Sequence, residues 1–336
     1  MQRDGRTFGG ETNFGRCSVA RHLQPVAFNR SMRSVTTSET LILCYHRVAE
    51  GVEDPFGLCV SPDNFAAHLD ELVRRREPST LDDLLIPSRR TRVVVTFDDG
   101  YSDNLSNALP IAASRAVPIT VFVTSGLLSG HAGFWWDRLA VLLRSRPAAM
   151  REFCLTAGGR TIRVPLDGTD FGADLSTVRR HLLPLSVPEI ESALDAVSES
   201  WSVGSTPPPD ARAMTPAELL ELAAADCVTI GAHTVDHVRL SGRPEREQID
   251  TVTASRRDLE NFLGRPVSQF AYPFGRQDDF DDCSVGAVRA AKFDNACTTL
   301  PGTARPSTDP YRLPRRLVMN WGRRRFQVQL QRWRIG

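Results

Sequence analysis

Short apolar runs alternate with amphipathic segments along much of the chain. The segment "SPDNFAAHLDELVRRR" (61–76) predicts a helix, because Ser61 fits an N-cap and Pro62 fits the first turn. Its apolar residues also recur every three or four positions. Runs that are apolar on both faces, as in buried parallel strands, occur at 41–48, 92–97 and 119–125. Strand, helix and strand in this order predict β/α units with right-handed crossovers.

The alternation stops between His131 and Asp210, where "FWWDRLAVLLRS" and "VPEIESALDAVSESW" favour helices. A structureless loop of this length is improbable, so 131–210 is interpreted as a mostly helical insertion between two strands. The alternation resumes at "TPAE" (215–218), a capping box that opens a helix. A later helix is expected to end at Gly264. Further strands are predicted in "VTIGAH", "VSQFAYPFG" and "YRLPRRLVMN".

About seven strands alternating with helices predict a parallel α/β barrel. In such a barrel the chemistry gathers at the C-terminal ends of the strands. We expect the barrel domain to span residues 39–322, with the insertion inside it. Residues 1–38 are expected to form a disordered leader, and 323–336 a basic C-terminal helix.

Composition and charge narrow the class of partners. The 336 residues are 41% hydrophobic, with 41 Lys and Arg against 40 Asp and Glu. This is an ordinary globular composition, and it gives no overall reason to expect nucleic acid or an anionic membrane as a partner. Arginines gather near the C-terminus. A solvated basic tail and helix face is the favoured interpretation, and a polyanion or membrane contact is the alternative.

The cysteine pattern and the targeting signals of a sequence help to predict the cellular compartment of the protein. The seven cysteines are scattered without a Cys-x-x-Cys pair, which favours buried thiols in a reducing compartment. No stretch approaches the ~18 apolar residues of a transmembrane helix. The leader lacks the apolar core of a secretory signal. We therefore expect no transmembrane segment, no signal peptide, and a location in the cytoplasm or at the membrane periphery.

Two adjacent carboxylates, Asp98 and Asp99 in "TFDDGY", end the strand at 92–97. Like charges repel unless a cation lies beside them. His233 ends another predicted strand, and His237 follows it by four residues. Two imidazoles and one carboxylate suit one divalent metal, with Zn first and Co, Mn, Ni or Fe as alternatives. Three protein ligands indicate a catalytic site, with the second carboxylate left to act as a base.

The motifs "TFDDGY", "HTVDH" and "AYPFG", in this order, resemble those of the NodB-type polysaccharide deacetylases, carbohydrate esterase family 4. The resemblance covers roughly residues 40–320 outside the insertion. It implies a distorted (β/α)7 barrel that removes acetyl groups from N-acetylated carbohydrates. It also implies that Asp98 is the general base and that Asp99, His233 and His237 bind the metal.

The sequence departs from this family pattern in two places. Ala271 stands where many members carry an arginine that orients the base, and no histidine follows His237, so the late Leu-x-His motif is missing. His46 in "CYHRV" resembles an N-terminal histidine that acts as the acid in one branch of the family. Arg315 is a candidate to hold Asp98 through a bidentate pair. The candidate catalytic set is therefore Asp98, His46 and Arg315.

Substrate contacts are predicted from aromatic residues and from the "YPFG" turn. The candidates are Tyr101, whose backbone N–H is a candidate oxyanion donor, and Tyr272, Pro273, Phe274, Trp135 and Trp136. Core packing and turn formation are the alternatives for the aromatic and turn residues.

The sequence leaves three functions open. The first is metal-dependent deacetylation of an N-acetylated polysaccharide, oligosaccharide or glycolipid precursor. The second is hydrolysis of a small formamide or a cyclic amide on the same fold, because loops and insertions decide the substrate. The third is an inactive carbohydrate-binding protein, which the complete set of base and ligands disfavours.

Overall fold

The computed structural model describes residues 39–333 apart from 51–53, 85, 87, 89, 130–132 and 158. The predicted leader (1–38) and the last three residues of the predicted C-terminal helix lie outside the described residues.

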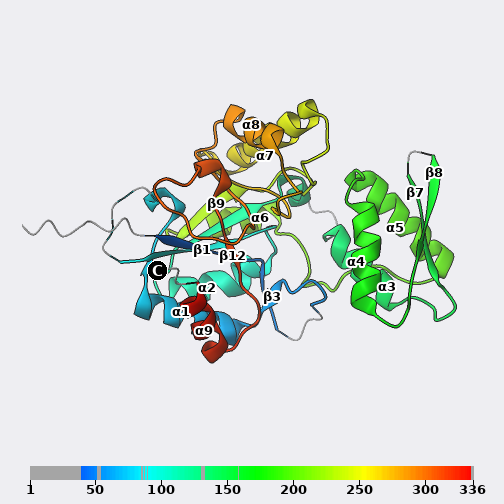
Figure 1. Ribbon diagram of the computed structural model, residues 1–336, viewed down its shortest axis with the longest axis horizontal. Coiled ribbons are helices and arrows are strands. Elements are labelled where there is room, and N and C mark those ends of the chain that lie inside the picture. Colours follow the sequence, from blue (N-terminus) through cyan, green and yellow to red (C-terminus); the bar gives the residue numbers. More distant parts are fainter. Residues whose placement is uncertain are drawn as a thin grey trace, which may run out of the picture. The chain divides into compact units, whose positions relative to one another are not determined.

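A curled parallel sheet forms the centre of the described chain, with strands in the order β11-β10-β9-β6-β5-β1-β12 (Figure 1). The strands are β1 (Thr40–Tyr45), β5 (Arg92–Phe97), β6 (Ile119–Val123), β9 (Val228–Ala232), β10 (Gln269–Ala271), β11 (Asn295–Cys297) and β12 (Arg316–Leu317). A parallel bridge from Cys297 to Leu313 connects the segment before β12 to β11, so the two ends of the sheet meet. The predicted parallel α/β barrel is therefore confirmed.

Three short strands complete the sheet structure of the barrel region. β4 (Glu77–Pro78) pairs with the start of β5, and β2 (Arg47–Val48) pairs with β3 (Cys59–Val60) in a separate parallel pair.

Side chains that alternate along the strands fill the barrel interior. Ile42, Val94, Phe122 and Leu313 belong to one buried cluster there. Gly231 in β9 makes room for the largest of them, because a Cβ at this position would lie 2.4 Å from the ring of Phe122. The interior is thus a packed core, as expected for a small barrel, and its polar end supplies the site.

Helices cover the outside of the sheet. They are α1 (Pro62–Arg75), α2 (Leu109–Ala113), α6 (Pro216–Ala223), α7 (Glu245–Leu263), α8 (Asp282–Ala290) and α9 (Arg323–Arg332). Three predicted helix signals are confirmed. Ser61 caps α1 by accepting from the backbone of Asn64, Thr215 and Glu218 form the capping box of α6, and Gly264 ends α7 with φ at 64°. The basic helix α9 packs against α1, where His68 stacks on Phe326.

The insertion predicted at 131–210 lies between β6 and β9 (Figure 1). Its apolar side chains form most of a second buried cluster, to which Tyr101 of the barrel also belongs. It contains α3 (Trp135–Arg144), β7 (Glu152–Ala157), β8 (Arg160–Pro165), α4 (Phe171–Leu182) and α5 (Val187–Trp201). The prediction of mostly helices is incomplete, because β7 and β8 form an antiparallel hairpin. Both strands are partly exposed and carry charged residues, so their apolar pattern is weak.

The short strand β11 was not predicted either. Its sequence, "NAC", contains no β-branched residue, and pairing with β10 holds it in the sheet. Among the described residues, no helix has both the length and the apolar character that a membrane crossing requires.

Candidate active site

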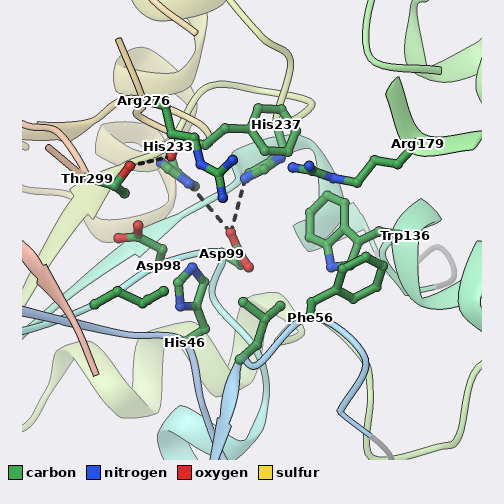
Figure 2. A pocket seen from close by; sticks show the side chains of 13 residues that line it. His46, Phe56, Asp98, Asp99, Trp136, Arg179, His233, His237, Arg276 and Thr299 are labelled. Carbon is green, nitrogen blue, oxygen red and sulfur yellow. Dashed lines mark hydrogen bonds and ion pairs between the residues drawn. The ribbon is translucent and has the colours of Figure 1, made fainter. Parts of the chain in front are cut away.

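A pocket of about 210 Å³ opens where the C-terminal ends of the barrel strands meet. It is lined by the predicted metal ligands Asp99, His233 and His237, together with Asp98 and His46 (Figure 2). These residues follow the strands β1, β5 and β9, which are far apart in the sequence. In a parallel α/β barrel the C-terminal ends of the strands meet at one face, as the sequence predicted for these residues.

Strained backbone is concentrated around this pocket. Of the seven non-glycine residues with positive φ in the described chain, four are Asp99 (75°), Thr234 (63°), His237 (53°) and Phe274 (60°). Such conformations cost roughly 1–3 kcal/mol each and persist only where the surrounding structure enforces them. These backbone conformations therefore lower the stability of the fold, and they set the directions in which the side chains project.

Asp99, His233 and His237 converge on one point. Asp99 Oδ1 lies 3.5 Å from His233 Nε2 and 3.2 Å from His237 Nε2. The other ring nitrogen of His233, Nδ1, lies 2.8 Å from the carbonyl oxygen of Ala271 and donates to it. This hydrogen bond fixes the ring and leaves the Nε2 lone pair facing Asp99.

The donor set fits a divalent cation. Ligand atoms about 2.0–2.1 Å from a tetrahedral zinc ion are roughly 3.3 Å from each other, which matches these separations. Asp99 Oδ1 is buried without a hydrogen-bond partner among the described residues. A buried acceptor of this kind fits a cationic ligand.

The directions of the pKa shifts of Asp99 and His237 agree with metal binding by these side chains. Burial opposes ionisation of Asp99, but His237 and His233 outweigh it and hold the pKa of the carboxyl well below its usual range. Burial lowers the pKa of His237, which favours the neutral imidazole that metal binding requires. His237 packs between Trp136 and Phe274, with ring centroids at 4.5 and 4.6 Å.

Asp98 is held by a buried bidentate ion pair with Arg315. Nη1 and Nη2 of Arg315 each lie 2.6 Å from one carboxylate oxygen of Asp98. Arg315 is completely buried and also donates to the Thr298 carbonyl at 2.8 Å and to Thr96 Oγ1 at 3.0 Å. The Cys44 thiol, whose pKa burial raises, donates to Asp98 at 3.5 Å.

This network fixes both the charge and the direction of Asp98. Burial alone would raise the pKa of Asp98, but Arg315 and His233 outweigh burial and lower it. Arg315 reaches Asp98 from the segment before β12, whereas Ala271 is part of the apolar barrel interior. The pairing is the one anticipated for Arg315 from the sequence.

His46 lines the same pocket on the side of Asp98. One ring nitrogen of His46, one oxygen of Asp98 and the sulfur of Cys44 lie within 4.8 Å of one another. His46 Nδ1 is buried and has no hydrogen-bond partner among the described residues. Its backbone carbonyl accepts from Asn104 at 2.8 Å, which fixes the end of the strand.

The structure brings only part of the predicted substrate-binding set to the pocket. Trp136 and Phe274 line it. Tyr101 is buried, with its hydroxyl donating to Asp137 at 2.8 Å and accepting from Trp136 Nε1 at 2.9 Å.

Tyr272 donates to the Tyr311 carbonyl at 3.0 Å, Trp135 belongs to the second buried cluster, and Pro273 is buried in its turn. For the side chains of Tyr272, Trp135 and Pro273, the prediction of substrate contact is corrected to core packing. The candidate role of Tyr101 belongs to its backbone N–H and stays a prediction.

Two of the lining residues that were not predicted carry charge. Arg179 comes from α4 in the insertion, and Arg276 follows the "YPFG" turn. Arg179 lies in "VRRHLL", where adjacent arginines are typical of a solvated helix face, so the sequence carried no signal for it.

Comparisons with known proteins bear on the family and the fold of the chain. The sequence profile of the polysaccharide deacetylase family matches residues 86–153 and 191–293. YxkH of Bacillus subtilis (strain 168), named among the polysaccharide deacetylases, is 20% identical over 281 residues, which are 82% of this chain and 69% of YxkH.

Two solved structures share the fold. The Streptococcus pyogenes deacetylase PplD, solved in complex with acetate, has a TM-score of 0.56 and 18% identity, with 89% of this chain and 100% of that chain covered. IcaB from Ammonifex degensii has a TM-score of 0.56 and 20% identity, with 88% of this chain and 97% of that chain covered.

Fold and site define a NodB-type barrel hydrolase that acts on carbon–nitrogen bonds other than peptide bonds. The chain belongs to the polysaccharide deacetylase family.

Proposed function

We propose that the protein removes the acetyl group from an N-acetylated sugar of a polysaccharide, an oligosaccharide or a glycolipid precursor, in a metal-dependent reaction. The observation that carries this proposal is the convergence of Asp99, His233 and His237 beside the Arg315-bound carboxylate of Asp98. A family assigned to deacetylation of carbohydrates supports the choice of substrate class.

Asp99, His233 and His237 would hold the metal, for which Zn is the first choice and Co, Mn, Ni or Fe are alternatives. When bound, it would supply Lewis-acid activation of the amide carbonyl and of a water molecule.

Asp98 and His46, which line the pocket beside the metal ligands, divide the proton transfers. Asp98 is ionised across the neutral range because Arg315 lowers its pKa, so it can accept a proton from the attacking water. The same ion pair stabilises the ionised form of Asp98. Asp98 is therefore poorly suited to hold a proton and donate it to the leaving amine. His46, which lines the pocket on the side of Asp98, is the proposed acid.

The direct test of this proposal is metal analysis together with acetate release from N-acetylglucosamine oligomers. We expect about one divalent ion per chain, loss of acetate release after chelation, and recovery when Zn²⁺ is restored. His237→Ala should lower the metal content and abolish turnover together. His181→Ala, on the partly exposed side of α4, is the matched control. Undiminished hydrolysis by demonstrably metal-free protein would refute the proposal.

His46→Gln separates proton donation from metal binding. We expect kcat to fall by about 10²–10³-fold, because the leaving amine loses its acid, while the metal content stays the same. Acetate release and elemental analysis on the same preparation measure both quantities. A variant with full kcat would assign the acid to another group.

A further inference from the structure

The pocket carries positive charge that the proposed deacetylation does not use. Arg179 and Arg276 line it, and every other lining residue outside the predicted catalytic and metal set is uncharged. Both side chains point toward the space above Asp99 (Figure 2).

Neither guanidinium has an anionic partner of its own. Among the described residues no carboxylate forms an ion pair with Arg179 or Arg276. Arg179 is partly buried and lies 4.9 Å above the Phe274 ring, which holds it in place. Burial and the charge of Arg276 both lower the pKa of Arg179, so the two cations repel each other.

Beyond Asp98 and Asp99 of the pocket itself, the carboxylate of Asp279 lies near the two arginines. It is buried, lies within electrostatic range of Arg179, Arg239 and Arg276, and accepts the backbone N–H of Arg276 at 3.0 Å. Apart from Asp98 and Asp99, this part of the pocket therefore has the one acid Asp279 near three arginines among the described residues. Arg179 and Arg276 themselves line the pocket, so an anion bound there would relieve the repulsion between them.

Two guanidinium groups together suit a phosphate better than a carboxylate. A carboxylate is satisfied by a single bidentate arginine, whereas a phosphate ester offers more acceptor oxygens and a larger charge. Arginine is also the residue best suited to phosphate recognition.

We infer that Arg179 and Arg276 form a binding subsite for a phosphate group on the substrate, so that the protein acts on an N-acetylated sugar that carries a phosphate ester or pyrophosphate. This inference rests on the proposed deacetylation and names the substrate class more narrowly. Its distinguishing feature is that the insertion contributes one of the two cations.

The test compares three N-acetylglucosamine derivatives on the full-length, metal-loaded protein. They are the methyl glycoside, the anomeric phosphate and the uridine diphosphate conjugate. Acetate release gives kcat/KM, and calorimetry gives the dissociation constant. The variants are Arg179→Gln, Arg276→Gln and the matched control Arg180→Gln, whose exposed side chain is adjacent on α4 and outside the pocket lining.

We expect at least one phosphorylated sugar to bind and react better than the methyl glycoside. That advantage should fall about tenfold or more in each pocket variant, as for loss of a hydrogen bond to a charged group, and should remain in the control. A larger advantage for the anomeric phosphate indicates a terminal phosphate, and a larger one for the conjugate indicates a pyrophosphate. Either order supports the subsite.

Equal affinity and kcat/KM for the neutral and phosphorylated sugars overturn the inference, and so does an advantage that both pocket variants retain. Acetate released equally from all three sugars would leave deacetylation standing while the phosphate subsite falls. Absence of acetate from every sugar would count against deacetylation, and the dissociation constants would still decide the subsite.

Discussion

Replacing Asp98 by Asn is expected to lower kcat for acetate release by about 10³-fold or more, because an amide cannot accept the proton of the attacking water. The side chain keeps its size and can still accept a hydrogen bond from Arg315. Metal content should stay near the wild-type level, since Asp99, His233 and His237 are unchanged. Kinetics and elemental analysis on one preparation check both expectations.

A matched control keeps this result specific. Asp278→Asn changes an exposed carboxylate on the loop that carries Arg276, and it should leave kcat within about twofold of wild type, as surface substitutions usually do. An Asp98→Asn enzyme that keeps wild-type kcat would show that another group is the base.

Replacing Arg315 by Met is expected to lower the free energy of unfolding by about 3–5 kcal/mol, because it leaves Asp98 buried without its counter-charge. Denaturant unfolding measures this loss. The folded-state pKa of Asp98 lies below its unfolded value of about 3.9. The contribution of the pair is therefore present above that pH and is lost as pH falls through the folded value.

The same substitution should change activity. Without Arg315, burial raises the pKa of Asp98, so the acidic limb of the kcat profile should move to higher pH. Arg315→Lys should recover part of the stability, because it restores the charge without the bidentate geometry. Arg324→Met, on an exposed position of α9, is the control and should alter neither property.

A double variant tests whether the two residues act as a pair. Asp98→Asn alone leaves a buried cation, and Arg315→Met alone leaves a buried anion. The double variant should therefore lose less stability than the sum of the two single losses. Strict additivity would mean that the ion pair contributes nothing to the fold.

Much of this site could be predicted from the sequence, because its residues lie at the ends of strands. The valine-rich strand before Asp98 and the capping signals of the helices fix the β/α alternation, and parallel strands then bring their C-terminal ends together. Arg315 was expected to pair with Asp98 because Ala271 stands where many family members carry the arginine that orients the base.

The residues that the sequence could not place depend on tertiary packing. Strand β11 exists because its neighbours supply hydrogen bonds, and the hairpin β7–β8 has a weak apolar pattern. Aromatic residues near the motifs suggested sugar contacts, but the hydroxyl of Tyr272 donates to a backbone carbonyl and Trp135 belongs to a buried cluster. Arg179 reaches the pocket through the placement of α4, which no local pattern encodes.

The division of the pocket between barrel and insertion has an evolutionary consequence. The barrel supplies the proposed metal ligands and base, while the insertion supplies Trp136 and Arg179 to the same pocket. Trp136 packs on the ring of His237, but Arg179 in α4 can change and so remodel the pocket wall while the reacting groups stay in place. A lineage could in this way acquire new sugars by altering one module and inheriting the other intact.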